Sequence, residues 1–275
     1  MGAKDSALRT PLHYAVAIKN WRAVEELLSL GAGKKEDLPN RLNDLAYCTV
    51  RAGQVDCVRA FVAASIDFHT RGVQGSTILH EAFSNEKTYF ATARYILEQE
   101  EGRRIVNAKC SGGSTPLHAL IRMHTALSED PNWRKMFKLL LQCSADIHAK
   151  SYAGGTPVHH LVGWNNRESS ILGLIPACFD FNIKAFREET ILHSAVRGRD
   201  EMLQNLLKLE GGKLAVNVPD DGGSTPLHLV AWYQNTEKVE LLLRFGADAW
   251  TKDDRGNMPL IYAKRRGPGT PSHTL

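Results

Sequence analysis

Thr225-Pro-Leu-His228 is the stretch that decides the fold, because the same short phrase recurs along the whole chain. Each copy lies just before a small residue and a helical run, and most copies are followed by a second run such as Val239–Leu243. A short unit that recurs at a fixed period predicts a solenoid of stacked repeats. The copies are Thr10-Pro-Leu-His13, Thr77-Ile-Leu-His80, Thr115-Pro-Leu-His118, Thr156-Pro-Val-His159, Thr190-Ile-Leu-His193, Thr225-Pro-Leu-His228 and Met258-Pro-Leu260.

A degenerate copy is hidden between the first two phrases. The segment Arg51–Val62 has the pattern of the back half of a repeat whose front half begins at Asp44. The eight repeats then begin at positions 10, 44, 77, 115, 156, 190, 225 and 258, with spacings of 34, 33, 38, 41, 34, 35 and 33. Most of these spacings lie close to a period of about 33 residues. In phrase and period the chain resembles the ankyrin-repeat family, over roughly residues 4–266.

The resemblance implies an all-α ankyrin-repeat solenoid of stacked helix-turn-helix units with short β-hairpin tips. The phrase has a physical explanation as well, because threonine caps a helix start and proline is tolerated at the first helical position. Gly31 and Gly246 suit the left-handed conformation that ends a second helix, and the paired glycines before three phrases suit tight turns. One helical pair cannot bury its apolar side alone, so we expect a single array over residues 1–275.

Several places depart from the repeat. Repeat four has eight extra residues around His124–Asn132, which form either a tolerated surface loop or an extra contact arm, with Asp130 and Pro131 starting the next helix. The last repeat ends early at Gly267-Pro-Gly269, so Lys264–Arg266 is either a polar cap or a localisation or nucleic-acid signal. The first hairpin is apolar for a terminal unit. Either the preceding residues cover it, or the chain was cut from something longer.

Composition favours a soluble protein of a reducing intracellular compartment, the cytoplasm or the nucleus. The chain is 43% hydrophobic and 23% charged, and it has no apolar run long enough to cross a membrane. Its five cysteines are widely spaced and form no CxxC pair, which argues against a disulfide framework or a zinc site. A net charge of +4 is too small to indicate nucleic acid. We expect no metal, no cofactor and no membrane or nucleic-acid partner.

Eleven histidines invite a catalytic or metal-binding interpretation, but six occupy the fourth place of the phrase. The resemblance implies that these six are structural, with imidazoles that hydrogen-bond loop backbone: His13, His80, His118, His159, His193 and His228. His160 stands in a usually apolar place, as Glu81 does in repeat three. No nucleophile elbow, phosphate loop or other catalytic motif occurs, and the repeats leave no room for a separate catalytic domain.

The concave groove expected for this architecture is the surface most open to function. Arginine and large aromatic residues concentrate at the groove positions of repeats four to seven, and these residue types are enriched at binding hot spots. We therefore predict a scaffold that binds a protein or peptide of acidic character. The predicted contacts are Arg122, Met123, Tyr152, Trp164, Phe186, Arg187, Arg197, Trp232 and Tyr233.

Two alternatives remain open at this point. Some of these aromatic residues could instead pack between repeats and belong to the core. The groove could also hold a small molecule or an unusual active site, with His160 and either Glu81 or Glu188 as acid-base groups. Glu25 and Lys238 are expected on the convex side, where they would serve as control positions.

Overall fold

The structure is a computed structural model. It describes residues 9–32, 41–64, 66–85, 87–124, 130–163, 169–175 and 179–265. The chain forms two compact units, Met1–Asp146 and Ile147–Leu275, and each unit is described by itself. One continuous array over residues 1–275 therefore stays a prediction.

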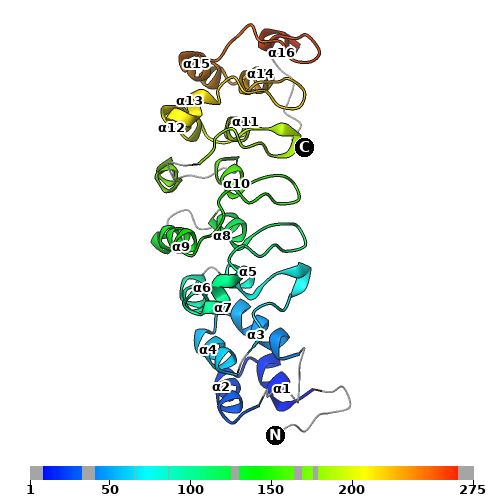
Figure 1. Ribbon diagram of the computed structural model, residues 1–275, viewed down its shortest axis with the longest axis vertical. Coiled ribbons are helices and arrows are strands. Elements are labelled where there is room, and N and C mark those ends of the chain that lie inside the picture. Colours follow the sequence, from blue (N-terminus) through cyan, green and yellow to red (C-terminus); the bar gives the residue numbers. More distant parts are fainter. Residues whose placement is uncertain are drawn as a thin grey trace. The chain divides into compact units, whose positions relative to one another are not determined.

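The first unit consists of helix pairs stacked in two layers (Figure 1). Helices α1, α3, α5 and α8 pack on one another in this order, and α2, α4, α6 and α9 form the second layer in the same way. The bounds are α1 (Pro11–Ala17), α2 (Trp21–Ser29), α3 (Arg41–Arg51), α4 (Val55–Ala63), η1 (Val73–Gly75), α5 (Ile78–Ala82), α6 (Tyr89–Glu98), α7 (Glu100–Arg104), α8 (Pro116–His124) and α9 (Pro131–Gln142). Helices α3 and α4 confirm the hidden second repeat.

The second unit has the same layered arrangement. Helices α10, α11, α14 and α16 pack in sequence, while η2, α12 and α15 form the other layer. The short 3-10 helix η2 stands where repeat five would have its second helix. The bounds are α10 (Pro157–Gly163), η2 (Ser169–Leu174), η3 (Phe186–Glu188), α11 (Ile191–Arg197), α12 (Asp200–Lys208), α13 (Glu210–Leu214), α14 (Pro226–Tyr233), α15 (Thr236–Arg244) and α16 (Pro259–Arg265).

The all-α fold class is confirmed, and the tips that join the repeats are tight turns. In each tip that the structure describes, a backbone N–H bonds back across the turn, as from Cys110 to the Ser114 carbonyl at 3.0 Å. Residues 9–265, where described, contain no strand, so these hairpin-like tips are turns alone. Glycine supplies the positive φ that the turn needs at Gly113, Gly154 and Gly223, and Gly31 and Gly246 also have positive φ, as predicted.

The helix starts follow the sequence-based expectation. Thr10, Thr77, Thr190 and Thr225 each form a capping box with the histidine three residues later. Asp130 caps α9 through a hydrogen bond from the Asn132 amide at 2.9 Å, with Pro131 at the first helical position. Residues 125–129 of the insertion, for which a surface loop and a contact arm are the two predictions, lie outside the described part.

Two short helices, α7 and α13, were not predicted. Each follows a long helix after one extended residue, Gln99 or Leu209, so the chain bends sharply there. A glycine makes both bends possible, because a Cβ at Gly102 would lie 1.8 Å from the Ile96 carbonyl oxygen, and one at Gly212 would lie 2.0 Å from that of Leu206. Both units therefore use a glycine to make the same sharp bend after a long helix.

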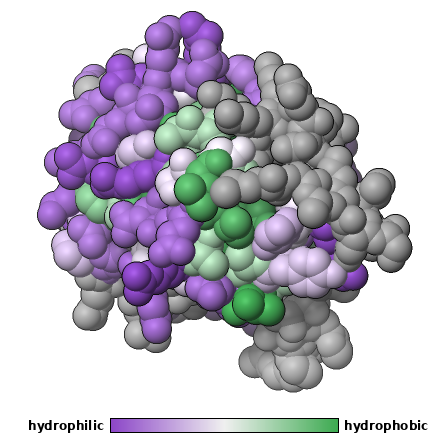
Figure 2. Space-filling model, turned by 90° about the horizontal axis from the view of Figure 1, so that it is seen from below, coloured by the Kyte–Doolittle hydropathy of each residue, from purple (hydrophilic) through white to green (hydrophobic). Residues whose placement is uncertain are grey.

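The end of the first unit is apolar, as expected from the first hairpin. Tyr14, Ile18 and Leu30 are exposed on α1 and at the end of α2, whereas Trp21 is half-buried. Figure 2 looks onto this end and shows apolar side chains near its centre, beside hydrophilic ones. At the other end of the chain, Lys264 is exposed on α16, while the side chains of residues 265 and 266 lie outside the described part.

Candidate functional site

The phrase histidines are built into the backbone of the turns. In all six, Nδ1 accepts a hydrogen bond from the backbone N–H of the threonine three residues earlier, at 3.1–3.4 Å. In His80, His193 and His228, Nε2 also donates to a backbone carbonyl of the following repeat, at 2.9–3.1 Å. Both ring nitrogens are thereby used, and the structural role implied by the resemblance is confirmed for these histidines.

His159 differs from His80, His193 and His228 in one respect. Its Nε2 is buried without a hydrogen bond of normal geometry, although the Glu189 carbonyl at the equivalent place still favours the protonated ring. Burial outweighs this effect and lowers the pKa of His159 to about 4. Burial also lowers the pKa of His80 and of His193. These imidazoles are therefore neutral at physiological pH and are poorly suited to act as acids.

The tips of the second unit present two large rings to solvent. Tyr152 is 75% exposed and Phe186 is 67% exposed, and each stands four residues before the start of a repeat. The turns beneath them are closed by backbone bonds, from Ser151 to the Gly155 carbonyl at 3.0 Å and from Ala185 to the Glu189 carbonyl at 2.7 Å. The rings are therefore held on ordered turns.

Neighbouring tips are also bonded to each other. The amide of Asp221 donates to the Arg187 carbonyl at 2.9 Å, and the amide of Asp254 donates to the Gly222 carbonyl at 3.1 Å. These bonds fix the register of the tips of repeats six, seven and eight. Arg187 and Glu188 both adopt positive φ, and Glu188 takes the place that glycine fills in the tips at Gly75, Gly113, Gly154, Gly223 and Gly256.

Arg197 is held by an ion pair with Glu189 of the same repeat. The guanidinium donates to both carboxylate oxygens, at 2.6 and 2.5 Å, in a bidentate arrangement. Burial alone would raise the pKa of the Glu189 carboxyl, but the hydrogen bonds and charge of Arg197 bring it below its usual range. Hydrogen bonds with Glu189 likewise raise the pKa of Arg197, and a hydrogen bond with Tyr233 adds to this effect. The pair is therefore fully ionised and internally neutralised.

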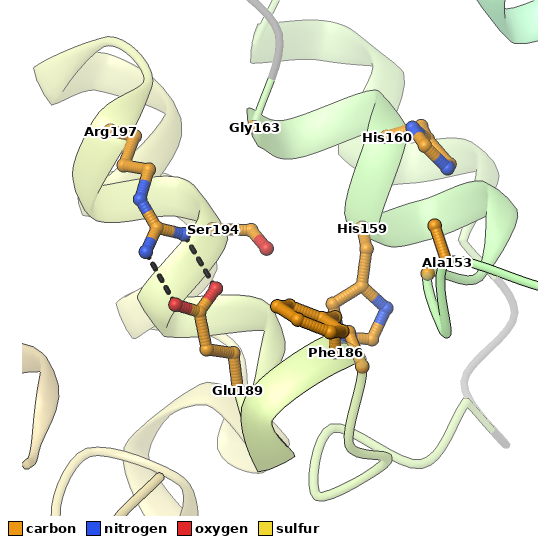
Figure 3. A pocket seen from close by; sticks show the side chains of 10 residues that line it. Ala153, His159, His160, Gly163, Phe186, Glu189, Ser194 and Arg197 are labelled. Atoms are coloured by element: carbon orange, nitrogen blue, oxygen red, sulfur yellow. Dashed lines mark hydrogen bonds and ion pairs between the residues drawn. The ribbon is translucent and has the colours of Figure 1, made fainter. Parts of the chain in front are cut away.

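An open pocket of about 220 Å³ lies between α10, α11 and the tip that carries Phe186. Figure 3 shows the Glu189–Arg197 pair at one end of this pocket, Phe186 in the middle and His160 at the opposite end. The backbone of Gly163 leaves room where arginine or tryptophan stands in several other repeats. The residues that line the pocket are Ala153, Gly155, His159, His160, Gly163, Ala185, Phe186, Glu189, Ser194 and Arg197.

The remaining predicted contacts are distributed over both units. Trp232 and Tyr233 lie at the end of α14 and are 37% and 48% exposed. The Trp232 ring also meets the Tyr262 ring edge-on, with centroids 6.0 Å apart, so this residue packs in part between repeats. In the first unit, Arg122 is exposed. Trp164 lies outside the described residues.

The predictions that placed Met123 and Lys238 on the surface are wrong. Met123 is 9% exposed on α8, so it belongs to the core of the first unit and not to a contact surface. Lys238, expected on the convex surface, is 6% exposed, and its Nζ donates to the carbonyls of Val196 and Gly198 at 2.8 and 2.6 Å. This lysine satisfies the C-terminal end of α11 and cannot serve as a control position. Glu25 is half-buried.

The acid-base residues of the enzyme alternative have other partners. Glu81 is buried and accepts hydrogen bonds from Ser76 Oγ at 2.6 Å and from Arg51, whose NH2 lies at 3.0 Å. Glu188 is exposed and pairs with Lys184 at 3.1 Å. Among the described residues, no group of histidine, cysteine or acidic side chains could hold a metal ion. None of the described helices is long and apolar enough to cross a membrane.

Sequence reasoning missed the ion pairs that hold Arg51 and Arg197. Both occupy the same place, seven residues after a repeat start, and Arg197 is one of the predicted groove contacts. A signal was present, since Glu81 stands at an inner-helix place that is usually apolar, and Glu189 stands where the other repeats have serine, glycine, asparagine or, in the first repeat, arginine. An unusual acid beside a groove arginine therefore indicates an internal ion pair.

Comparisons with known proteins agree with this architecture. The families described as "Ankyrin repeats (many copies)" and "Ankyrin repeat" match residues 209–263 and 8–41. The E3 ubiquitin-protein ligase KEG of Arabidopsis thaliana is 26% identical over 80% of this chain and 16% of that protein. Human Ankyrin repeat and SOCS box protein 16 is 26% identical over 92% of this chain and 52% of that protein. The chain thus spans at most about half the length of these relatives.

A solved structure extends the likeness to three dimensions. The ankyrin repeat domain of human ASB11 matches 82% of this chain and 99% of its own length, with a TM-score of 0.58 and 20% identity. Capped helix pairs joined by bonded tips define a helical repeat protein. The chain has ankyrin repeats at residues 8–41 and 209–263, and its fold is that of an ankyrin repeat domain. Together these findings indicate a protein–protein interaction scaffold.

Proposed function

We propose that the chain recognises a protein or peptide through the groove-side surface of its second unit. The residues that would carry this contact are Tyr152, Phe186, Arg187, Arg197, Trp232 and Tyr233, together with Trp164. The observation that supports it most is the pair of tip rings, Tyr152 and Phe186, exposed on turns closed by backbone hydrogen bonds. Rigid aromatic side chains lose little conformational entropy on binding and bury much area, so they suit a recognition surface.

Neither ring has a packing role that explains its size. A large apolar side chain at the tip of a turn stabilises the fold little, because most of it remains in water. Three other tips show that the turn does not need one, since the equivalent places are filled by Ser111, Asp221 and Asp254, whereas a fourth tip has Val73. Grouped exposed aromatic residues are typical of interaction sites. Arg122, on the first unit, is retained only as an outlying contact, and the buried Met123 is left out.

A small-molecule site or active site is the weaker alternative. The pocket of about 220 Å³ is smaller than the roughly 300–1,000 Å³ typical of small-molecule sites. His160 lines this pocket, but Figure 3 places it at the opposite end from the Glu189 carboxylate, which already pairs with Arg197. An acid-base pair must lie within hydrogen-bond reach of one substrate proton, which this arrangement does not favour.

The cysteines support an intracellular location, cytoplasmic or nuclear, as part of the proposal. Among the described residues, Cys48, Cys57, Cys110 and Cys143 are free thiols. Thiols persist where the compartment is reducing. A thiol count of five on protein purified under non-reducing conditions supports this proposal, and intramolecular disulfides would contradict it.

The experiment begins with a display library of random 12-residue peptides selected on the full chain. Binding of the best synthetic peptide is then measured for single alanine variants at Tyr152, Phe186 and Trp232. We expect at least one of them to weaken binding by about 2 kcal/mol, the size of a hot spot, with stability changed by less than about 0.5 kcal/mol at the tips. Trp250, 77% exposed on a turn after α15, is the matched control. Peptides that bind all three variants like the wild type would contradict the proposal.

A further inference from the structure

The Phe186 pocket, as we call the pocket described above, is a hollow on the recognition surface. One wall is the exposed Phe186 ring, and the other is the polar Glu189–Arg197 pair. Its floor is made by small groups, including Gly163 and Ser194, where a Cβ added to Gly163 would lie 3.4 Å from the Ser194 Cβ. The pocket is therefore apolar on one side and offers hydrogen-bonding groups on the other.

The size of the Phe186 pocket restricts what can enter it. A cavity of about 150 Å³ is enough to hold benzene, so a pocket of about 220 Å³ has room for one aromatic side chain. It is too small for a larger ligand to be enclosed. Offset or edge-on contact with the Phe186 ring favours an aromatic guest over an aliphatic one.

The charges around the Phe186 pocket are balanced within the protein. Arg197 pairs with Glu189 at 2.5 Å, Lys184 pairs with Glu188 at 3.1 Å, and Arg187 lies 3.9 Å from Asp221. The stretch 179–200 has four acidic and four basic residues. An acidic partner would have to compete with Glu189 for a bidentate arginine, and it would be repelled by the neighbouring carboxylates. This arrangement is complementary to a segment without net charge.

We infer that the Phe186 pocket receives one aromatic side chain of a partner segment that carries no net charge. This inference rests on the proposed function, since it concerns the same surface, and it replaces the acidic character expected from the arginine count. The aromatic ring contacts Phe186, and the Glu189–Arg197 pair offers hydrogen bonds to a hydroxyl or to backbone groups of the segment.

The test uses the same display library on the full chain, with Gly163→Arg as a pocket-filling variant. This change places at Gly163 the residue that the chain itself has at the equivalent Arg51, Arg122 and Arg197. Gly163 is helical, so the substitution needs no unusual backbone conformation. Trp250→Ala again serves as the control. The peptides are sequenced, and the Kd of the best one is measured at 50 and 500 mM salt.

We expect enriched peptides with an aromatic residue and no net charge, and a Kd that changes less than about threefold with salt. Replacing the aromatic residue by alanine, or introducing Gly163→Arg, should weaken binding at least tenfold, while Trp250→Ala leaves it unchanged. Enrichment of acidic peptides, a Kd that rises tenfold with salt, unimpaired binding to a folded Gly163→Arg variant, or no enrichment at all would overturn the inference.

A wrong recognition surface and a wrong pocket occupant would give different results. If alanine at Tyr152, Phe186 or Trp232 abolishes binding while the peptides are acidic, the inference about the pocket is wrong and the recognition surface stands. If peptides bind but none of these three positions matters, both the surface and the pocket are wrong. A circular-dichroism spectrum and a thermal unfolding curve for each variant show whether the loss reflects unfolding.

Discussion

Mild acid should destabilise the fold through its neutral phrase histidines. The Thr156 amide points its N–H at Nδ1 of His159, at 3.4 Å, so a proton on this nitrogen would oppose a donor. Burial lowers the pKa of this ring to about 4, against 6.5 for an ordinary histidine. The pKa values of His80 and His193 are lowered by the same cause. All three histidines must therefore lower the free energy of unfolding as the pH falls.

The sign and size of the pH effect on the free energy of unfolding follow from proton linkage. Between pH 6.5 and about 4 the unfolded chain binds a proton at His159 and the folded chain does not. The stabilisation is therefore complete above pH 6.5 and is lost as the pH falls toward 4, with a total of about 3 kcal/mol for this residue at about 1.4 kcal/mol per pH unit. The Glu189 carboxyl, whose pKa is lowered, contributes stability that is lost only at more acidic pH. The range from pH 7 to 5 thus isolates the histidines.

The assay is urea unfolding of the full chain at pH 7, 6 and 5, followed by circular dichroism. His159→Gln is the matched variant, because glutamine is a normal capping-box partner and does not titrate. The fall in unfolding free energy per pH unit near pH 5 should be smaller in this variant, by about 1.4 kcal/mol. An unfolding free energy that stays constant from pH 7 to 5, or an equal slope in both proteins, would refute the reasoning.

Three further predictions concern stability and metal binding. Leu117→Ala and Leu227→Ala remove side chains that are 0% and 2% exposed, so each should lower the unfolding free energy by about 2–5 kcal/mol; losses under about 1 kcal/mol at both would show that the repeat register is wrong. Glu188→Gly should raise the unfolding free energy by up to about 1 kcal/mol, because glycine adopts the positive φ of this turn without strain; a destabilised variant would contradict this. A chelator should leave the Tm unchanged, since the phrase histidines bond to the backbone, and stoichiometric zinc in native protein would count against it.

Local features were predictable from sequence because each depends on a few neighbouring residues. The capping boxes, the Asp130 cap and the left-handed glycines all follow from residues within one turn. The exposure of Tyr152 and Phe186 also followed, since their places at the tips are set by the repeat. Each of these predictions needed only the register of a single repeat.

The features that escaped prediction depend on partners outside the local pattern. Lys238 reaches carbonyls about forty residues earlier, and Arg51 reaches Glu81 in the next repeat, so the pattern of one repeat alone reveals neither contact; only the unusual acid at Glu81 pointed to the second. The short helix α13 and the reduced η2 lie in repeats six and five, whose spacings of 35 and 34 are close to the period, so the spacing gave no sign of either. Sequence predicted which places could contact a partner, but not which arginines were already paired.

Hydrogen–deuterium exchange of the full chain, with and without a selected peptide, tests the central claim that the second unit's tips and groove side bind the partner. The account predicts slower exchange on binding in the tips at 151–155 and 185–189 and at the end of α14, with no change at 248–251. Slower exchange confined to α12 and α15, with the tips unaffected, would contradict it.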